Sequence, residues 1–252
     1  MPDSFWMYPL LFLAGAVAGW IDSIAGGGGL VTIPVLLGIG LPPQLALGTN
    51  KFQASFGSFT AALYHVRKHV VLLHDARFGI IMTLVGAAAG TFAVQLIRPG
   101  VLDIIIPILL LAIAIYMLVG PIPSDADRTP KLTRLPFYIL AGLLFGFYDG
   151  FFGPGVGSFW AIAFVVGLGF QLMKATGYTK VMNFTSNIVS FILFLIGGHV
   201  LFAAGLIMAA GQILGARIGS GLVLKRGARF IRPVFITVVI ATTLKLIYDR
   251  ML

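Results

Sequence analysis

The chain has 252 residues, of which 59% are hydrophobic and 10% charged, and its mean hydropathy is +1.02. Soluble proteins carry about 25% charged residues, so a chain this poor in charge cannot cover a water-facing surface. The lack of cysteine excludes disulfides and thiolate metal sites. The net charge of +9 lies in short segments between apolar runs, which is typical of cytoplasmic loops and argues against nucleic-acid binding.

Ten apolar runs follow one another along the chain, and most approach the ~20 residues that a helix needs to cross a bilayer. They span 8–24, 30–41, 43–64, 77–97, 101–120, 135–148, 155–170, 178–196, 200–224 and 231–248. A polar, proline-rich stretch divides them into two sets of five. We therefore predict an all-α polytopic membrane protein with a first membrane repeat at 1–120, a cytoplasmic linker at 121–134 and a second repeat at 135–252.

Each set begins with two short runs that a glycine-rich segment separates. In the first set the separator is Gly26, Gly27, Gly28 and Gly29, and in the second it contains Gly153 and Gly155. Glycine in a helix costs nearly 1 kcal/mol relative to alanine, so four in succession predict a break in the helix.

The two sets also align residue by residue. Asp22, Gly26 and Gly28 match Asp149, Gly153 and Gly155 at an offset of 127 positions, and Lys51 matches Lys180 at an offset of 129. An aspartate and a lysine in register argue that the sets are copies of one unit rather than a coincidence of glycines.

The basic residues indicate how the two copies are oriented. They gather at 67–77, 128–134 and 225–232, and cytoplasmic loops carry an excess of Lys and Arg. All three clusters reach the cytoplasmic side only if each broken pair enters and leaves by the same face. The sequence therefore predicts two inverted repeats, each a broken, re-entrant helix pair plus three transmembrane helices, with both termini outside.

Several stretches resemble the TauE/SafE family of sulfite exporter-like permeases. In the first half they are Ile21–Leu30, Gly40–Pro43 and Ala46–Lys51, and in the second half Gly146–Gly155, Lys174–Thr176 and Lys180–Asn187. The resemblance covers essentially the whole chain. It implies a multi-pass permease of the bacterial inner (cytoplasmic) membrane, without enzymatic activity or cofactor, in a family whose name comes from members linked to sulfite, sulfonates and related organosulfur anions.

Asp22 and Asp149 each precede a glycine break within apolar surroundings. A carboxylate at the centre of a membrane helix costs about 2.5–3.5 kcal/mol on insertion scales, so each residue needs a reason. One interpretation is coupling or gating, in which the aspartate accepts a proton or pairs with a lysine during transport. The other is that each aspartate caps free backbone N–H groups at the break. The two interpretations are compatible, and the sequence leaves both open.

The glycine breaks are candidate substrate-binding segments. Free N–H groups and the helix dipole at the start of the following half-helix favour an anion, and broken helices at matching positions are a recurrent binding-site design in transporters. The residues concerned are Gly26, Gly27, Gly28, Gly29, Gly153, Gly155 and Gly157. The alternative is that these small residues merely allow helices to pack closely.

Polar residues surround the two lysines at the start of the next helix in each half. The candidates for binding an oxyanion are Thr49, Asn50 and Lys51, with Thr176, Tyr178, Lys180, Asn183 and Asn187. Asn183 and Asn187 follow Lys180 at i+3 and i+7, on one helix face. The alternative is that the lysines extend to the membrane surface and the asparagines bind other helices.

The remaining motifs favour no cofactor and no metal. His65 and His69 flank Arg67 and Lys68, so we expect them in a cytoplasmic basic loop rather than in a metal site. We predict a secondary transporter of a small anion that works by alternating access. An anion channel and an intramembrane aspartyl-type enzyme built on Asp22 and Asp149 are the alternatives. The expected partners are a small anionic solute and membrane lipid, and the sequence leaves open whether the chain forms a homo-oligomer.

Overall fold

The computed structural model describes residues 6–119 and 129–226, and all regular secondary structure in these ranges is helical. The helices are α1 (Met7–Ala25), α2 (Gly29–Gly38), α3 (Pro43–Arg67), α4 (Leu73–Gln95), α5 (Pro99–Val119), α6 (Arg134–Phe151), α7 (Val156–Leu168), α8 (Leu172–Ile196) and α9 (Phe202–Arg226). The all-α prediction is confirmed. The last predicted run, 231–248, and most of the linker at 121–134 lie outside the described residues, and α6 already begins at Arg134.

Five of these helices are long and apolar enough to cross a membrane, namely α1, α4, α5, α8 and α9. Large apolar side chains cover their outer faces: on α5, for example, Ile104 and Ile108 are 59% and 60% exposed. A water-facing surface of this kind would drive aggregation, whereas in a bilayer it contacts acyl chains. α3 has 25 residues but falls short in hydropathy because its inner face carries polar side chains, including Asn50 and Lys51.

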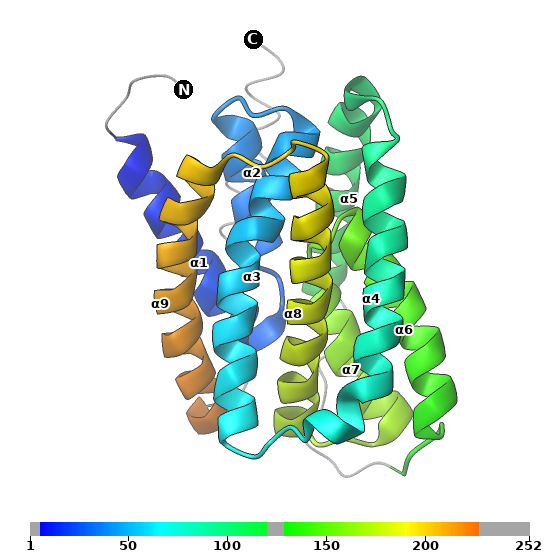
Figure 1. Cartoon of the computed structure of the whole chain (residues 1–252). Helices are drawn as coiled ribbons and strands as arrows, with labels where there is room; N and C mark the ends of the chain where they lie inside the picture. The colour runs from blue at the N-terminus through cyan, green and yellow to red at the C-terminus, as the bar shows by residue number, and fades with distance from the viewer. Residues whose placement is uncertain (1–5, 120–128, 227–252) are drawn as a thin grey trace.

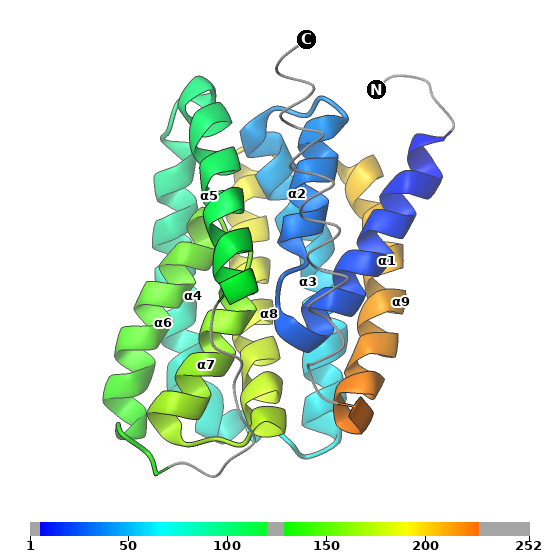
Figure 2. The same ribbon diagram turned by 180° about the vertical axis from the view of Figure 1, so that it is seen from behind.

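The two broken pairs open toward opposite ends of the bundle. α1 and α2 turn inside the bundle and open toward the end that holds the α8–α9 connection (Figure 1). α6 and α7 open toward the other end, where α3 connects to α4 (Figure 2). These are the directions that the inverted-repeat prediction requires; the repeat relation itself remains a prediction.

Equivalent glycines make equivalent contacts in the two halves. A Cβ atom on Gly86 of α4 would lie 2.5 Å from the carbonyl oxygen of Leu143 in α6. A Cβ atom on Gly215 of α9 would overlap the carbonyl oxygen of Ala16 in α1. The positions correspond at the offsets found in the sequence, 129 for the glycines and 127 for their neighbours. Small residues thus let α4 approach α6 and α9 approach α1 at backbone distance, as in many membrane helix pairs.

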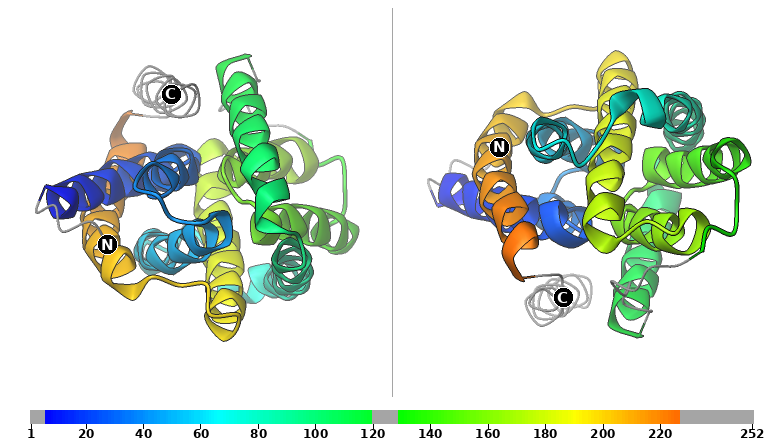
Figure 3. Two further views of the ribbon diagram at one scale, coloured as in Figure 1. Left: turned by 90° about the horizontal axis from the view of Figure 1, so that it is seen from above. Right: turned by 90° about the horizontal axis from the view of Figure 1, so that it is seen from below.

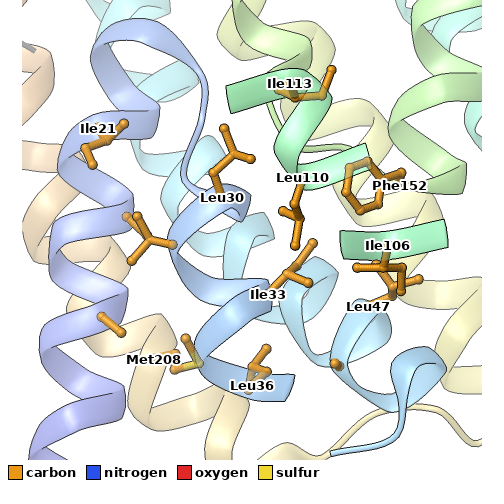
Figure 4. Packing of buried hydrophobic residues seen from close by; sticks show 14 of the residues in the cluster. Ile21, Leu30, Ile33, Leu36, Leu47, Ile106, Leu110, Ile113, Phe152 and Met208 are labelled. Carbon is orange, nitrogen blue, oxygen red and sulfur yellow. The ribbon is translucent and has the colours of Figure 1, made fainter. Parts of the chain in front are cut away.

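Two apolar clusters flank a polar centre. One joins α1, α2 and α5 through Ile21, Leu30 and Leu110 (Figure 4). The other is largely aromatic and joins α6, α7 and α8 through residues such as Trp160. Viewed from the ends of the bundle, α8 runs between the two groups of helices, and it contacts α3, α4 and α7 (Figure 3). The buried polar residues of α3 and α8 therefore face each other between the clusters.

Candidate functional site

The two glycine breaks meet inside the bundle. A Cβ atom on Gly26, in the first break, would overlap the backbone of Gly157, and one on Gly157 would lie 2.5 Å from the Cα of Gly26. Gly26 and Gly155 also have positive φ angles of 70° and 80°, which side-chain-bearing residues rarely adopt. The fold therefore requires glycine at the breaks, both for the positive φ angles and for the close approach of Gly26 to Gly157. The Nδ2 atom of Asn183 borders the same spot, 3.1 Å from the Cβ that Gly157 lacks.

Lys51 of the first half binds Asp149 of the second. Its ammonium lies 2.5 Å from Oδ1 of Asp149 and also donates to the backbone oxygen of that residue. The Ser186 hydroxyl donates to Oδ2. Both lysine and aspartate side chains are almost fully buried, at 1% and 3% exposed. Such a pair is stable only when its members are hydrogen-bonded, and here both carboxylate oxygens have a donor.

Lys180 of the second half binds the first half in a different way. Its ammonium donates to the backbone oxygen of Asp22, and no carboxylate oxygen of the described residues lies within 4.0 Å of it. The carboxylate of Asp22 instead accepts the Gly28 N–H group at 3.4 Å. Lys180 is 1% exposed. Each lysine therefore binds the aspartate residue of the opposite half, but in different ways. Lys51 forms an ion pair with the Asp149 carboxylate, whereas Lys180 contacts only the backbone oxygen of Asp22 among the described residues.

The two aspartates make different contacts, and their roles in coupling or gating stay predictions. Asp149 pairs with a lysine, and Asp22 caps the start of α2. No hydrogen bond joins the two carboxylates within the described residues.

Hydrogen bonds extend this polar centre along α3. The Thr32 hydroxyl on α2 donates to Oδ1 of Asn50 at 2.5 Å, and Nε2 of Gln53 donates to the same oxygen at 2.9 Å. Lower on α3, the Ser58 hydroxyl accepts from Nδ2 of Asn187 at 3.5 Å. Oε1 of Gln53 and Oδ1 of Asn183 are buried without a partner among the described residues, so the centre has spare hydrogen-bond acceptors.

Not every predicted binding residue lies in this centre. The Thr49 hydroxyl accepts the Leu201 N–H group at 2.9 Å and so fastens α3 to the chain just before α9. The Tyr178 ring packs against Phe164 and Phe170, with ring centroids 5.8 and 5.1 Å away. Thr176 is buried on α8. Of the remaining glycines, Gly29 faces Pro154 across the breaks, and Gly153 packs directly on the Lys51–Asp149 pair.

The sequence reasoning missed two buried residues beside the centre. Ser186, which holds Asp149, lies at i+3 from Asn183 on α8, so the helix periodicity could have added it to the candidate site. His65 was expected in a cytoplasmic loop, but that prediction is wrong. It belongs to α3, because that helix continues to Arg67, and its side chain is fully buried.

Broken helices that meet within a membrane bundle, with buried lysines and an aspartate beside them, are the architecture of a membrane transporter. The chain belongs to the family described as Sulfite exporter TauE/SafE, which matches residues 11–246. This confirms the resemblance. The chain is therefore a multi-pass transporter of the bacterial inner membrane that carries a small solute.

Similar proteins of the family cover nearly the whole chain. This chain is 49% identical over 240 residues to the "Probable membrane transporter protein YfcA" of Escherichia coli (strain K12). The aligned region covers 95% of this chain and 89% of the relative. The chain is 48% identical over 241 residues to a "Probable membrane transporter protein" of Haemophilus influenzae, which covers 96% of this chain and 94% of the relative. No solved structure matches the chain.

Proposed function

We propose that the chain is a secondary transporter of a small anion, in particular sulfite, a sulfonate or a related organosulfur anion. Lys180 carries the proposal. It is a buried ammonium beside the glycine breaks, and within the described part of the chain it donates to a backbone oxygen and to no carboxylate. A charge buried in a membrane protein is costly unless it is paired. An oxyanion at Lys180 would supply the missing charge, and the Asn183 side chain lies one helical turn away on α8.

The name of the family, sulfite exporter, supports the chemical class. An anion with several oxygens matches the lysine ammonium and the asparagine amide as hydrogen-bond donors, and α2 and α7 begin at the two breaks. The starts of these helices also provide the positive ends of two helix dipoles. A cationic or apolar solute would use none of them.

The unequal lysine–aspartate partnerships support alternating access. In this conformation Lys51 is paired with Asp149, whereas Lys180 and Asp22 are unpaired. In the opposite conformation we expect Lys180 to pair with Asp22 and Lys51 to part from Asp149. Asp22 and Asp149 would then be the gating residues, and the inverted repeats would supply the two related conformations.

The test is transport by the purified protein in liposomes, with sulfite and methanesulfonate as probes. We expect saturable uptake that Lys180→Met abolishes, because the anion then loses its cationic partner. Lys174→Met is the matched control: it removes a lysine from the same helix, but one that lies over the Phe170 ring at 4.4 Å, away from the breaks. Absence of flux for either anion in the unmodified protein would overturn the proposal, and flux that rises without saturation would indicate a channel.

A further inference from the structure

His65 is a buried histidine whose ring has no hydrogen-bond partner. The side chain lies within the last turns of α3 and is 0% exposed. Neither Nδ1 nor Nε2 finds an acceptor or a donor in the described part of the chain. Two unpaired polar atoms on one buried side chain are costly in a folded protein, so the position calls for a reason beyond packing.

Packing alone does not require an imidazole at this position. His65 packs on Gly177 of α8, where an added Cβ would be 3.4 Å from the Cβ of His65. At the equivalent place in the other half, Phe194 of α8 lies against Gly48 of α3, with the corresponding distance 2.9 Å. Both pairs correspond at the offset of 129. The second half therefore has a buried aromatic residue without polar side-chain atoms at the equivalent position, and the two ring nitrogens distinguish His65 from it.

Charged residues lie near His65 on two helices. Lys180 follows Gly177, on which His65 packs, by one turn of α8, and Arg67 ends α3 two residues after His65. On its own helix, the Tyr64 ring stands edge-on at a centroid distance of 5.7 Å. No carboxylate of the described residues forms an ion pair with His65. A proton on the ring would place a second positive charge near Lys180, whereas an anion bound at Lys180 would stabilise that proton.

We propose that His65 is the proton-binding residue of the transport cycle, and that the anion and one proton bind together. The inference rests on the proposed anion site at Lys180. In this cycle, water on the side where the anion binds supplies the proton to an imidazole nitrogen. The proton returns to water on the other side of the membrane when the anion leaves. Asp149 is less suited to this task, because Lys51 and Ser186 already occupy both of its oxygens.

Proton uptake can be measured apart from transport. Sodium methanesulfonate, which does not titrate near neutral pH, is added to the purified protein in a calorimeter, in buffers that differ in ionisation enthalpy. We expect binding of the anion to take up about one proton in the unmodified protein. His65→Phe, which copies the other half of the protein, should remove that uptake while thermal unfolding remains cooperative. His74→Gln changes an exposed histidine and should leave the uptake unchanged.

The outcomes separate the two proposals. If methanesulfonate does not bind to the unmodified protein, the anion site at Lys180 fails and this inference fails with it. If the anion binds without taking up a proton, or if His65→Phe takes up as much as the unmodified protein, the anion site stands and the role of His65 is overturned. In liposomes, a pH gradient should accelerate methanesulfonate uptake by the unmodified protein and not by His65→Phe.

Discussion

The two buried lysines have the same place in their respective halves but different partners. Lys51 meets a carboxylate, and Lys180 meets a backbone oxygen. Removing one member of a buried pair leaves an uncompensated charge, whereas removing both leaves none. The stability of the protein should therefore respond very differently to single and double changes at Lys51 and Asp149.

We expect Lys51→Met or Asp149→Leu alone to lower the free energy of unfolding by about 3–5 kcal/mol. The double variant should lose less than either single variant. Equilibrium unfolding in mixed micelles measures these differences. Additive losses in the double variant would show that the two side chains do not interact.

At this scale the sequence identified equivalent charged residues in the two halves but not the groups that they bind. The repeat identified Asp22, Lys51, Asp149 and Lys180 as equivalent pairs, because an offset can be read from the letters alone. It could not reveal that each lysine reaches the opposite half. His65 was misplaced because Arg67 and Lys68 follow it closely, although α3 continues as far as Arg67.

At the scale of the elements, glycine decides where helices end and how near they come. The sequence predicted both breaks and all nine described helices, but several helices extend beyond their apolar runs. α4 begins at Leu73 rather than 77, and α8 begins at Leu172 rather than 178. Polar residues such as Asp75 and Lys174 form these first turns, since a helix continues into the membrane surface after its apolar part ends. Hydropathy detects only the apolar part.

The contact between the breaks gives a prediction of its own. Gly26→Ala should lower the free energy of unfolding by about 2–4 kcal/mol, because alanine strains the left-handed backbone by ~1 kcal/mol and its Cβ overpacks the Gly157 backbone by ~1–3 kcal/mol. The control is Gly100→Ala on α5, where an added Cβ meets nothing within 4 Å. Equal effects of both substitutions would contradict the contact.

At the scale of the whole molecule, the basic clusters predict which end of the bundle faces the cytoplasm. The chain has no cysteine, so a single introduced cysteine reports one position without interference. Lys68 lies between α3 and α4, at the end predicted to be cytoplasmic, and Gly100 lies at the opposite end; both are exposed.

In intact cells, a membrane-impermeant maleimide should label Gly100→Cys and should not label Lys68→Cys until the cells are opened. The reason is that basic loops remain on the cytoplasmic side. Protein labelling followed by gel shift measures this directly. Labelling of both positions from the same side would refute the crossing of α4 between them, and the reverse pattern would refute the predicted orientation.

The bare backbone contact of Gly26 with Gly157 also sets a limit on the path of the solute. Where two main chains touch, no atom fits between them. The solute must therefore pass beside this contact, next to Lys51 or Lys180. Otherwise it can pass only after the two main chains separate. The largest distance to which the Gly26 and Gly157 main chains can separate would then set the largest anion that the protein transports.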